Sequence, residues 1–458
     1  MKKIPDRVMV ISLDAVGSRD LEFMKTLPHF KAFFEKGALC EHVKSVYPSI
    51  TYPAHTSIIT GRKPANHGVI NNTKLQPDRD GADWICQRKY IKSTTLYDEA
   101  MKMGKKVAAL LWPVVGQSKI PYSVPEIMVT RKWQNQILVN ALNGPLFYQL
   151  DLNRRFGHLR DGIRQPALDN FTHASALYTI RKYNPDLFLL HFTDADTNRH
   201  IYGVDHQKAQ DAIRRHDERL GELLEALAET GDMEKTTVVL LGDHYQKDAE
   251  HIVYLNEVLR KEGLLEYLPQ AQKERTGATG DHRRPGDSGI RKWKAVTKTC
   301  DGSCYVYLEG GESASEALKE QVRSLFDTLA ARPEYGIAKV FSQNEAAELG
   351  ADPACFLMLE AAEGYVFLDG CGQEFKEVKD EKKHTMHGTH GYLPDADGYG
   401  TFFAACGCGI SPGIIARTIE LWDEGVTLAK LMGLDLGDAD GQVIGEMLEQ
   451  TNAVRIKL

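Results

Sequence analysis

Short aliphatic and β-branched runs recur along the chain, and a polar, turn-rich segment follows each of them. Runs of this length and composition are typical of strands buried on both faces of a sheet. The runs cover residues 8–13, 107–111, 187–192 and 237–241, with a shorter one at 402–405. Amphipathic stretches typical of helices lie between them, at 28–36, 94–103 and 206–230. Strands that alternate with helices predict an α/β fold, in which a mostly parallel sheet is sandwiched by helices.

A second group of elements follows a polar, glycine-rich loop at 271–290. It contains a helix pattern at 315–332 and strand patterns at 304–308, 355–359 and 365–368. This content suits a small α+β subdomain inserted at 291–383, which is smaller than most domains but large enough to fold. We therefore predict a catalytic core made of residues 1–270 and 384–458. Within that core, residues 114–170 are expected to form a lid of helices and loops over the site.

Charge and cysteine content exclude several classes of protein. The formal net charge is −7, so no basic surface predicts binding to nucleic acid or to an anionic membrane. No stretch reaches the ~18 apolar residues of a membrane span, and the first apolar run leads into Asp14 rather than into a secretory cleavage site. Eight cysteines in 458 residues do not suggest a disulfide scaffold. We expect a cytoplasmic protein that acts on a small molecule.

Residues that commonly bind metals follow three of the predicted strands. They are Asp14, then Asp194 and Asp196, then Asp243 and His244. In parallel sheets, ligands bind beyond the carboxyl ends of the strands, so these side chains are expected at one edge. In a chain without a basic surface, metals would supply the positive charge that a substrate phosphate needs. Taken alone, Asp14 would more often be a helix cap or a turn residue.

Two histidines complete the set of possible ligands. Asp196 and His200 are four residues apart, so one turn of helix places both on one side, where they could share a metal. A simple ion pair between them is an equally good reading. Far downstream, glycines flank His390 and permit close backbone approach. We predict that His390 is a ligand and that nearby His387 is a bystander.

A threonine begins the short helix that is predicted after residue 50. Pro53 in its first turn and Gly61 at its end frame this helix, with Thr51 near the start. The positive end of the helix dipole would stabilise both an alkoxide on Thr51 and a bound phosphate. An N-cap role is the commoner one for threonine at such a position.

Together these segments resemble the nucleotide pyrophosphatase/phosphodiesterase branch of the alkaline phosphatase superfamily. The resemblance rests on Thr51-Tyr52-Pro53-Ala54-His55, on Thr60-Gly61 and on the run from His67 to Asn72, followed in the family's order by Asp196-x-x-x-His200, Asp243-His244 and His390-Gly391-Tyr392. It covers roughly residues 7–256 and 384–415. It implies an alkaline-phosphatase-like fold and two divalent ions, with Zn²⁺ expected and Mn²⁺ as an alternative.

The resemblance also implies a role for each matching residue. Asp14, Thr51, Asp243 and His244 match the ligands of one ion, and Thr51 is also the nucleophile. Asp196, His200 and His390 match the ligands of the other ion. Asn72, 21 residues after Thr51, matches the amide that holds the phosphate oxygens. The implied activity is hydrolysis of a phosphodiester or nucleotide pyrophosphate through a phosphothreonine intermediate.

Three departures from the family pattern leave the substrate class open. Ile50 replaces a common basic residue, Asp194-Ala195-Asp196 replaces Glu-Pro-Asp, and Arg199 stands where a glycine is usual. A phosphomonoesterase, or a phosphonate hydrolase resembling phosphonoacetate hydrolase, could use the same scaffold.

Further residues bear on these rival readings. A phosphonoacetate hydrolase would need a cation for the substrate carboxylate, which Lys119, Arg131 or Lys132 could supply, although each is more simply a surface charge. Tyr52 and Trp112 could stack on a base, but packing is the favoured reading. A catalytically silent binding protein would be expected to lack the nucleophile or a ligand. The pairs Cys300/Cys304 and Cys406/Cys408 are expected to be ordinary buried thiols rather than a structural zinc site.

Overall fold

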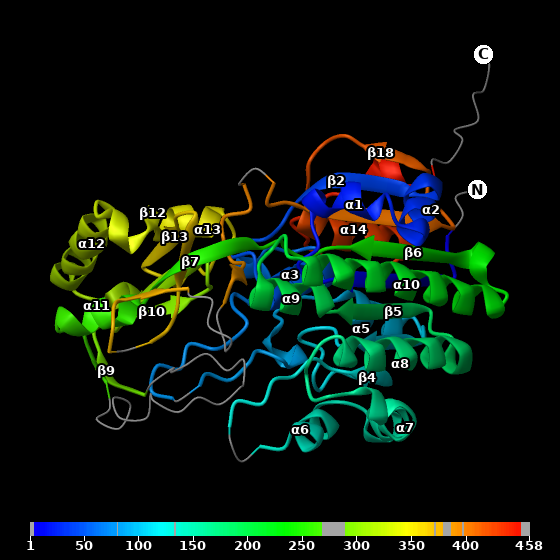
Figure 1. Ribbon diagram of the computed structural model, residues 1–458, viewed down its shortest axis with the longest axis horizontal. Coiled ribbons are helices and arrows are strands. Elements are labelled where there is room, and N and C mark those ends of the chain that lie inside the picture. Colours follow the sequence, from blue (N-terminus) through cyan, green and yellow to red (C-terminus); the bar gives the residue numbers. More distant parts are fainter. Residues whose placement is uncertain are drawn as a thin grey trace.

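The protein has a larger and a smaller lobe, each built around its own sheet (Figure 1). The computed structural model describes residues 4–79, 81–131, 134–267, 289–370, 372–378, 386–395 and 398–449. Most of the predicted loop at 271–290 lies outside these ranges, as does Lys132.

A sheet of nine strands forms the centre of the larger lobe. Across the sheet the strands are β18 (Gly413–Ile415), β2 (Ala38–Lys44), β17 (Thr401–Gly407), β6 (Thr236–Leu241), β1 (Arg7–Leu13), β5 (Leu187–Phe192), β3 (Val107–Leu110) and β4 (Tyr122–Val124), with β19 (Ile419–Glu420) also beside β2. Only β17 is antiparallel to its neighbours. The five runs predicted as strands are β1, β3, β5, β6 and β17. The mostly parallel sheet confirms the predicted fold class.

Helices cover both faces of this sheet because the side chains of each strand alternate between them. On β1, Val8 and Val10 belong to one apolar core, and Met9, Ile11 and Leu13 belong to the other. The first core is shared with α3 (Thr51–Thr60), α5 (Leu96–Lys102) and α14 (Leu421–Met432). The second is shared with α2 (Pro28–Lys36), α8 (Ala167–Tyr183) and α10 (Gln207–Glu229). Four of these helices, α2, α3, α5 and α10, lie where the sequence pattern predicted them.

The smaller lobe contains an antiparallel sheet of four strands. Its order is β10 (Ala295–Thr299), β11 (Ser303–Leu308), β13 (Leu357–Ala361) and β12 (Ile337–Ser342). Helices α12 (Glu316–Ala330) and α13 (Gln343–Glu348) pack against β12. A further sheet pairs β7 (Lys247–Val253) with β14 (Gly364–Phe367), β15 (Phe375–Glu377) and β16 (Gly388–Thr389). Strands β8 (Leu265–Tyr267) and β9 (Ile290–Trp293) pair with each other, and α11 (Leu255–Lys261) precedes them.

The remaining helices lie between these layers or on the outside of the larger lobe. They are α1 (Leu21–Met24), α4 (Pro64–His67), α6 (Gln136–Asn143), α7 (Leu146–Phe156) and α9 (Asp194–Tyr202). Helix α9 follows β5 at the edge of the main sheet, while α7 packs on α8 and β4 (Figure 1). Within the described ranges, no helix combines the length and apolarity that crossing a bilayer requires.

Candidate active site

Three side chains gather where β1 and β6 end. Asp14 follows β1, and Asp243 and His244 follow the parallel neighbour β6. Their ligand atoms all lie within 4.8 Å of one another. His244 Nε2 is 3.2 Å from Asp243 Oδ2 and 3.4 Å from Asp14 Oδ1. We call these three residues the first cluster.

Burial sets the protonation of the first cluster. Burial, with the nearby charge of Asp196, raises the pKa of Asp14 to about 7. Burial and Asp14 raise the pKa of Asp243 well above its usual range, and burial lowers that of His244. Within the described part of the chain, Asp14 Oδ1 and Asp243 Oδ2 are buried without a hydrogen bond. Facing carboxylates beside a neutral imidazole fit a divalent cation, which would offset their repulsion.

A second group of possible ligands combines α9 with the loop after β16. The ligand atoms of Asp196, His200 and His390 lie within 4.8 Å of one another, and we call these residues the second cluster. Asp196 Oδ1 is 3.2 Å from His200 Nε2 and 4.0 Å from His390 Nε2. His200 Nδ1 donates to the carbonyl of Gly388 over 2.7 Å. When the ring is neutral, that bond places the proton on Nδ1 and leaves Nε2, on the side of Asp196, as the ligand atom.

Opposite charges face each other in the second cluster. Burial disfavours the ionised form of Asp196, but His200 and His390 outweigh it and lower the pKa. Burial likewise opposes a charged His200, yet Asp196 raises its pKa to about 9. The rings of His244 and His390 are 4.3 Å apart between centroids. The two clusters are therefore direct neighbours.

Thr51 lies beside the first cluster, at the beginning of α3. Its hydroxyl Oγ1 is 3.1 Å from His244 Nε2. It is the first residue of the helix, and the N-cap position belongs to Ile50. The hydroxyl is thus directed at the metal-ligand side chains instead of capping the helix, which suits a nucleophile activated by a cation.

Asn72 is tied to the same helix end. Its side-chain Oδ1 accepts a hydrogen bond of 2.9 Å from the backbone N–H of Tyr52. Because the carbonyl end is engaged next to Thr51, the amide is held there with Nδ2 as its donor group. This placement suits the predicted contact with phosphate oxygens.

Two buried histidines for which no role was predicted support the first cluster. His191 Nε2 lies 3.1 Å from Asp14 Oδ2, and its Nδ1 is 3.0 Å from the carbonyl of Leu111. His55 Nδ1 donates to the carbonyl of Thr51 over 2.9 Å and lies 3.4 Å from Asp243 Oδ2. Such partners orient ligand side chains. His191 could have been recognised from the sequence, because it is a polar residue inside a buried apolar strand.

A buried ionic network holds the start of α9. Asp169 on α8 accepts hydrogen bonds of 3.1 Å from the backbone N–H groups of Thr193 and Asp194. Asp194 itself accepts two bonds from Arg215, and Arg219 Nη1 lies 3.3 Å away. The aspartate that departs from the family pattern therefore anchors the helix carrying Asp196 and His200.

The smaller lobe holds the loop that carries His390. Gly302 N–H donates to the carbonyl of His390 over 2.8 Å, and Ser303 Oγ donates to that of Gly391 over 2.6 Å. Asp301 Oδ2 lies 3.9 Å from His390 Nδ1. From the larger lobe, the carbonyl of Ser49 accepts from Gly391 N–H over 3.0 Å. One ligand of the second cluster is thus positioned by both lobes.

Arg199 does not face the clusters, although it precedes His200 in the chain. Its side chain is 2% exposed and donates to Asp20 Oδ1 over 2.6 Å. It also donates to the carbonyl of Ala15 and stacks on Tyr245 at 4.7 Å. The cation that replaces a family glycine therefore serves the loops behind the site.

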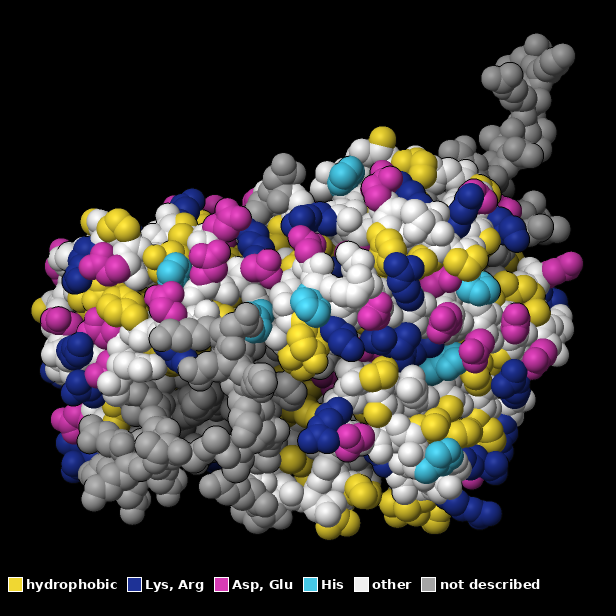
Figure 2. Space-filling model, in the orientation of Figure 1, with side chains coloured by type: hydrophobic (Ala, Val, Ile, Leu, Met, Phe, Trp, Pro, Cys, Tyr) yellow, Lys and Arg dark blue, Asp and Glu magenta, His cyan; other side chains and the backbone are white. Residues whose placement is uncertain are grey.

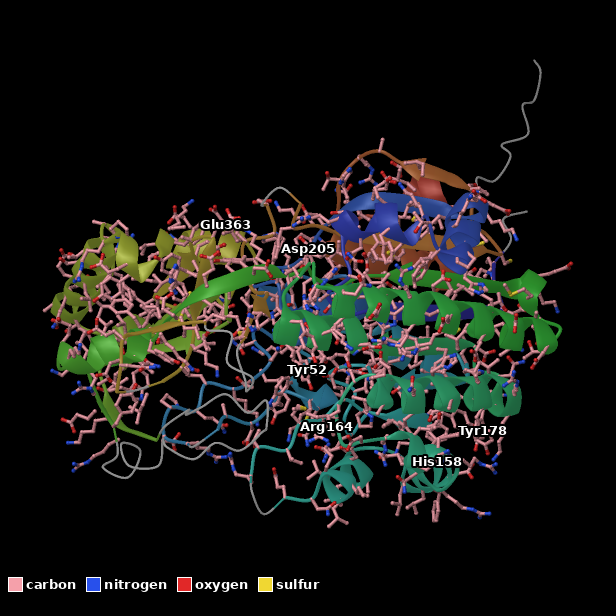
Figure 3. All side chains as sticks on the ribbon, viewed as in Figure 1. Tyr52, His158, Arg164, Tyr178, Asp205 and Glu363 are labelled. Carbon is pink, nitrogen blue, oxygen red and sulfur yellow. The ribbon has the colours of Figure 1, made fainter. Side chains whose placement is uncertain are left out.

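Most of the residues that were candidates for substrate contacts have other partners in the structure. Arg131 Nη2 lies 2.9 Å from Asp83 Oδ1. Tyr52, near the middle of the molecule in Figure 3, is fully buried and donates to the carbonyl of Glu126. Trp112 is fully buried against the ring of His55 at 4.9 Å. The two aromatic residues therefore pack.

The cysteines of the two predicted pairs belong to different lobes. Cys300 and Cys304 are part of the core of the smaller lobe, whereas Cys406 lies in β17 and packs against the core of the larger lobe. This separation agrees with ordinary thiols.

The chain is similar in sequence and fold to known proteins. The sequence profile of the type I phosphodiesterase / nucleotide pyrophosphatase family matches residues 8–393. Human ectonucleotide pyrophosphatase/phosphodiesterase family member 1 is 22% identical over 240 residues, which are 51% of this chain and 23% of that protein. The bis(5'-adenosyl)-triphosphatase ENPP4 of Pongo abelii is 24% identical over 253 residues, or 53% of this chain and 48% of that protein. The chain thus spans about a quarter to a half of the length of these relatives.

Solved structures show the same fold. Murine ectonucleotide pyrophosphatase/phosphodiesterase 5 superposes with a TM-score of 0.63 at 17% identity, covering 97% of this chain and 100% of that one. An inactive variant of the same murine protein in complex with AMP gives a TM-score of 0.63 at 16% identity, with the same coverage. Since the profile match takes in both clusters, Thr51 and Asn72, the chain belongs to the type I phosphodiesterase / nucleotide pyrophosphatase family.

Proposed function

We propose that the chain hydrolyses phosphodiester or nucleotide pyrophosphate bonds at a site for two divalent cations, with Thr51 as the nucleophile. The observation that carries the proposal is the position of the Thr51 hydroxyl, 3.1 Å from His244 Nε2 and beside two groups of metal-ligand residues. The names of two relatives support the substrate class, since one is a bis(5'-adenosyl)-triphosphatase and another is in complex with AMP.

The first and second clusters would each hold one ion. Mixed carboxylate and imidazole ligands favour zinc, with manganese as the alternative. Bound there, two divalent cations supply positive charge that lowers the pKa of a hydroxyl and neutralises phosphate oxygens.

The side chains of the protein supply the remaining steps. Thr51 Oγ1 attacks phosphorus in line, the bond from oxygen to phosphorus forms, and the bond to the leaving group breaks. Asn72 Nδ2 donates to an equatorial phosphate oxygen, where charge develops in the transition state. Water then cleaves the phosphothreonine, which releases the phosphate product and restores the Thr51 hydroxyl.

Replacement of the nucleophile tests this mechanism. Thr51→Ala should lower kcat by roughly a thousandfold or more, because it removes the attacking hydroxyl. Its metal content should stay near two ions per chain. Thr51→Ser is the matched control, since it keeps a hydroxyl and should keep measurable turnover. Unchanged turnover in Thr51→Ala would remove the covalent mechanism.

A substrate panel tests the reaction class. A p-nitrophenyl nucleotide diester should be hydrolysed faster than p-nitrophenyl phosphate and faster than phosphonoacetate. Preference for the monoester or for phosphonoacetate would contradict the proposed class and favour the corresponding hydrolase. The pairing of Arg131 with Asp83 weighs against a carboxylate-binding role for that arginine. We also propose a cytoplasmic location, which fractionation of the host cell would check.

A further inference from the structure

Gln246 is a buried glutamine that connects the two clusters. It comes two residues after His244 of the first cluster, and it is 1% exposed. Its amide nitrogen Nε2 donates to Asp196 Oδ1 over 2.5 Å. The same nitrogen lies 3.3 Å from the backbone carbonyl of Asp196. A residue of the chain segment that supplies the first cluster therefore contacts a ligand of the second cluster.

The contacted oxygen is the one that faces the two histidines of the second cluster. Asp196 Oδ1 lies 3.2 Å from His200 Nε2 and 4.0 Å from His390 Nε2. Because a carboxylate oxygen has more than one lone pair, Oδ1 can accept the amide hydrogen and still bind a cation. The hydrogen bond also restricts rotation of the carboxylate group. Gln246 thus holds this oxygen toward the two imidazole rings.

The two ends of the Gln246 amide are used unequally. Among the residues that the structure describes, its carbonyl oxygen Oε1 is buried and accepts no hydrogen bond. The opposite orientation of the amide would place that oxygen against the carboxylate of Asp196, which is repulsive, so the contact with Asp196 decides the orientation. A buried carbonyl without a donor costs free energy, and a methionine would fill a similar volume without that cost. The contact with Asp196 therefore explains why a glutamine stands here.

The side chain also packs against the segment that leads to His390. Strand β7 begins directly after Gln246 and pairs with β16, which ends one residue before His390. An added Cβ at Gly388 would lie 2.7 Å from Gln246 Oε1, so the glycine allows close packing. The carbonyl of Gly388 in turn accepts from His200 Nδ1 over 2.7 Å. Gln246 therefore contacts one ligand of the second cluster and packs against the segment that holds the other two.

We propose that Gln246 is a positioning residue for the ion of the second cluster. This inference rests on the proposed function, because it requires an ion at Asp196, His200 and His390. Replacing a residue that orients a metal ligand typically lowers metal affinity by about 10- to 100-fold. Gln246 is buried and contacts Asp196, so it acts on the ion through that carboxylate. The segment from Asp243 to Gln246 thus supplies ligands of one ion and orients a ligand of the other.

Few other places on the chain should bind zinc tightly. In the parts of the chain that the structure describes, the groups of three or more possible metal ligands are the two clusters. On the face that Figure 2 shows, histidine side chains are scattered singly over the surface. A lone histidine binds zinc weakly compared with several converging ligands. Two tightly bound ions would therefore report on the two clusters.

The test is a zinc titration of the metal-free full chain in competition with a chromophoric chelator. Gln246→Met keeps the volume of the side chain but cannot donate a hydrogen bond. It should raise the dissociation constant of one ion by about 10- to 100-fold and leave that of the other within about threefold of the wild type. Gln246→Asn keeps an amide but is one methylene too short to reach Asp196, so it should weaken the same ion.

The matched control is Gln207→Met. Gln207 Nε2 donates to a carboxylate in the same way, with Asp211 Oδ1 at 2.9 Å, but the pair is exposed on α10. The control should bind both ions as the wild type does.

Turnover separates positioning from a direct role in the reaction. With Zn²⁺ in excess over the raised dissociation constant, Gln246→Met should recover kcat to within about threefold of the wild type. The KM for the p-nitrophenyl nucleotide diester should not change, because the buried side chain does not contact substrate. A low kcat at full metal occupancy would show that Gln246 acts on the reacting groups, and would overturn the proposal.

The titration also distinguishes this proposal from the proposed function. If the wild type binds two ions and both Gln246 variants bind them equally tightly, the role of Gln246 is overturned and the proposed function stands. Equal weakening of both ions would overturn that role as well, since a general loss of packing would then explain the result. A wild type that binds fewer than two ions would remove the proposed function, and the role of Gln246 with it.

Discussion

Arg199 and Asp20 form an ion pair at 2.6 Å in which the arginine side chain is 2% exposed and the aspartate side chain 10%. The pair sits behind the loops that supply the first cluster. Arg199 donates to the carbonyl of Ala15, the residue after Asp14, and stacks on Tyr245, the residue after His244. One guanidinium therefore contacts the residue that follows Asp14 and the residue that follows His244.

Loss of that guanidinium should destabilise the fold. Arg199→Met would leave Asp20 as a buried carboxylate without its partner, and removing one member of a buried ion pair typically costs about 3–5 kcal/mol. Urea denaturation would measure the change in the free energy of unfolding. The double variant Arg199→Met/Asp20→Asn should recover part of the loss. Additive losses in the double variant would show that the two residues do not act as a pair.

Each cluster should account for one cation. Asp14→Asn should remove an ion from the first cluster and Asp196→Asn one from the second, because an amide is a weaker ligand than a carboxylate. Elemental analysis after dialysis should fall from about two ions per chain to about one in each variant. His387→Ala is the control, since His387 lies near the site but was predicted to be a bystander, and it should keep both ions. Loss of an ion in that control would reassign His387 as a ligand.

The loop of His390 should tolerate only glycine at position 391. Gly391 has φ +91°, and an added Cβ would lie 1.7 Å from the carbonyl oxygen of Cys300. Gly391→Ala should therefore displace His390, lower the content of the second ion and reduce turnover at least tenfold. Gly433→Ala shares the positive φ, at +68°, but has open space around its Cβ. The control should cost only about 1 kcal/mol of stability, and equal effects of the two changes would exclude the steric explanation.

The free energy of unfolding should fall as the pH rises, because Glu360 loses its proton. Burial raises its pKa to about 7, although hydrogen bonds from Leu393 N–H and from the Tyr47 hydroxyl oppose the shift. The folded state therefore holds a proton that the unfolded chain releases near pH 4.5. The protonated Glu360 contributes its full stabilisation below pH 4.5, and this stabilisation is lost as the pH rises from 4.5 to about 7. At 1.36 kcal/mol per pKa unit the loss is roughly 3 kcal/mol.

Denaturation curves at several pH values would measure this effect. Glu360→Gln cannot ionise, so the free energy of unfolding should depend less steeply on pH between 4.5 and 7 than in the wild type. Glu309→Gln, at an exposed position, is the control and should leave the slope unchanged. A wild-type slope retained in Glu360→Gln would assign the effect to another group.

Strands buried on both faces were predictable because their sequences are uninterrupted apolar runs, as in β5 and β6. Strand β2 escaped prediction because Glu41 and His42 interrupt its run, although the strand pairs with β17. Strand β14 has a strand-like sequence, but its pairing with β7 depends on chain geometry that no local pattern records. The division of the chain at 291–383 and the lid at 114–170 stay predictions.

Asp14, Asp196, Asp243 and His244 were predictable because parallel strands place their carboxyl ends at one edge. His390 follows β16 in another sheet, and it was predicted from its glycine-containing segment and from the resemblance. The roles of the individual ligands, of Thr51 and of Asn72 stay predictions that the experiments above address. The supporting residues were not predictable in the same way. His55 belongs to the motif that carries the resemblance, but its approach to Asp243 depends on tertiary packing, and so does that of Asp301 to His390.

The double attachment of the His390 loop makes the two clusters unequal. The first cluster follows two neighbouring strands of one sheet, whereas the second combines α9 with a loop that both lobes hold. A relative movement of the two lobes would widen only the second cluster. Its ion should therefore exchange with solution faster, and a chelator should remove it first. The two ions would then leave in a fixed sequence, and the chain would pass through a state that holds one.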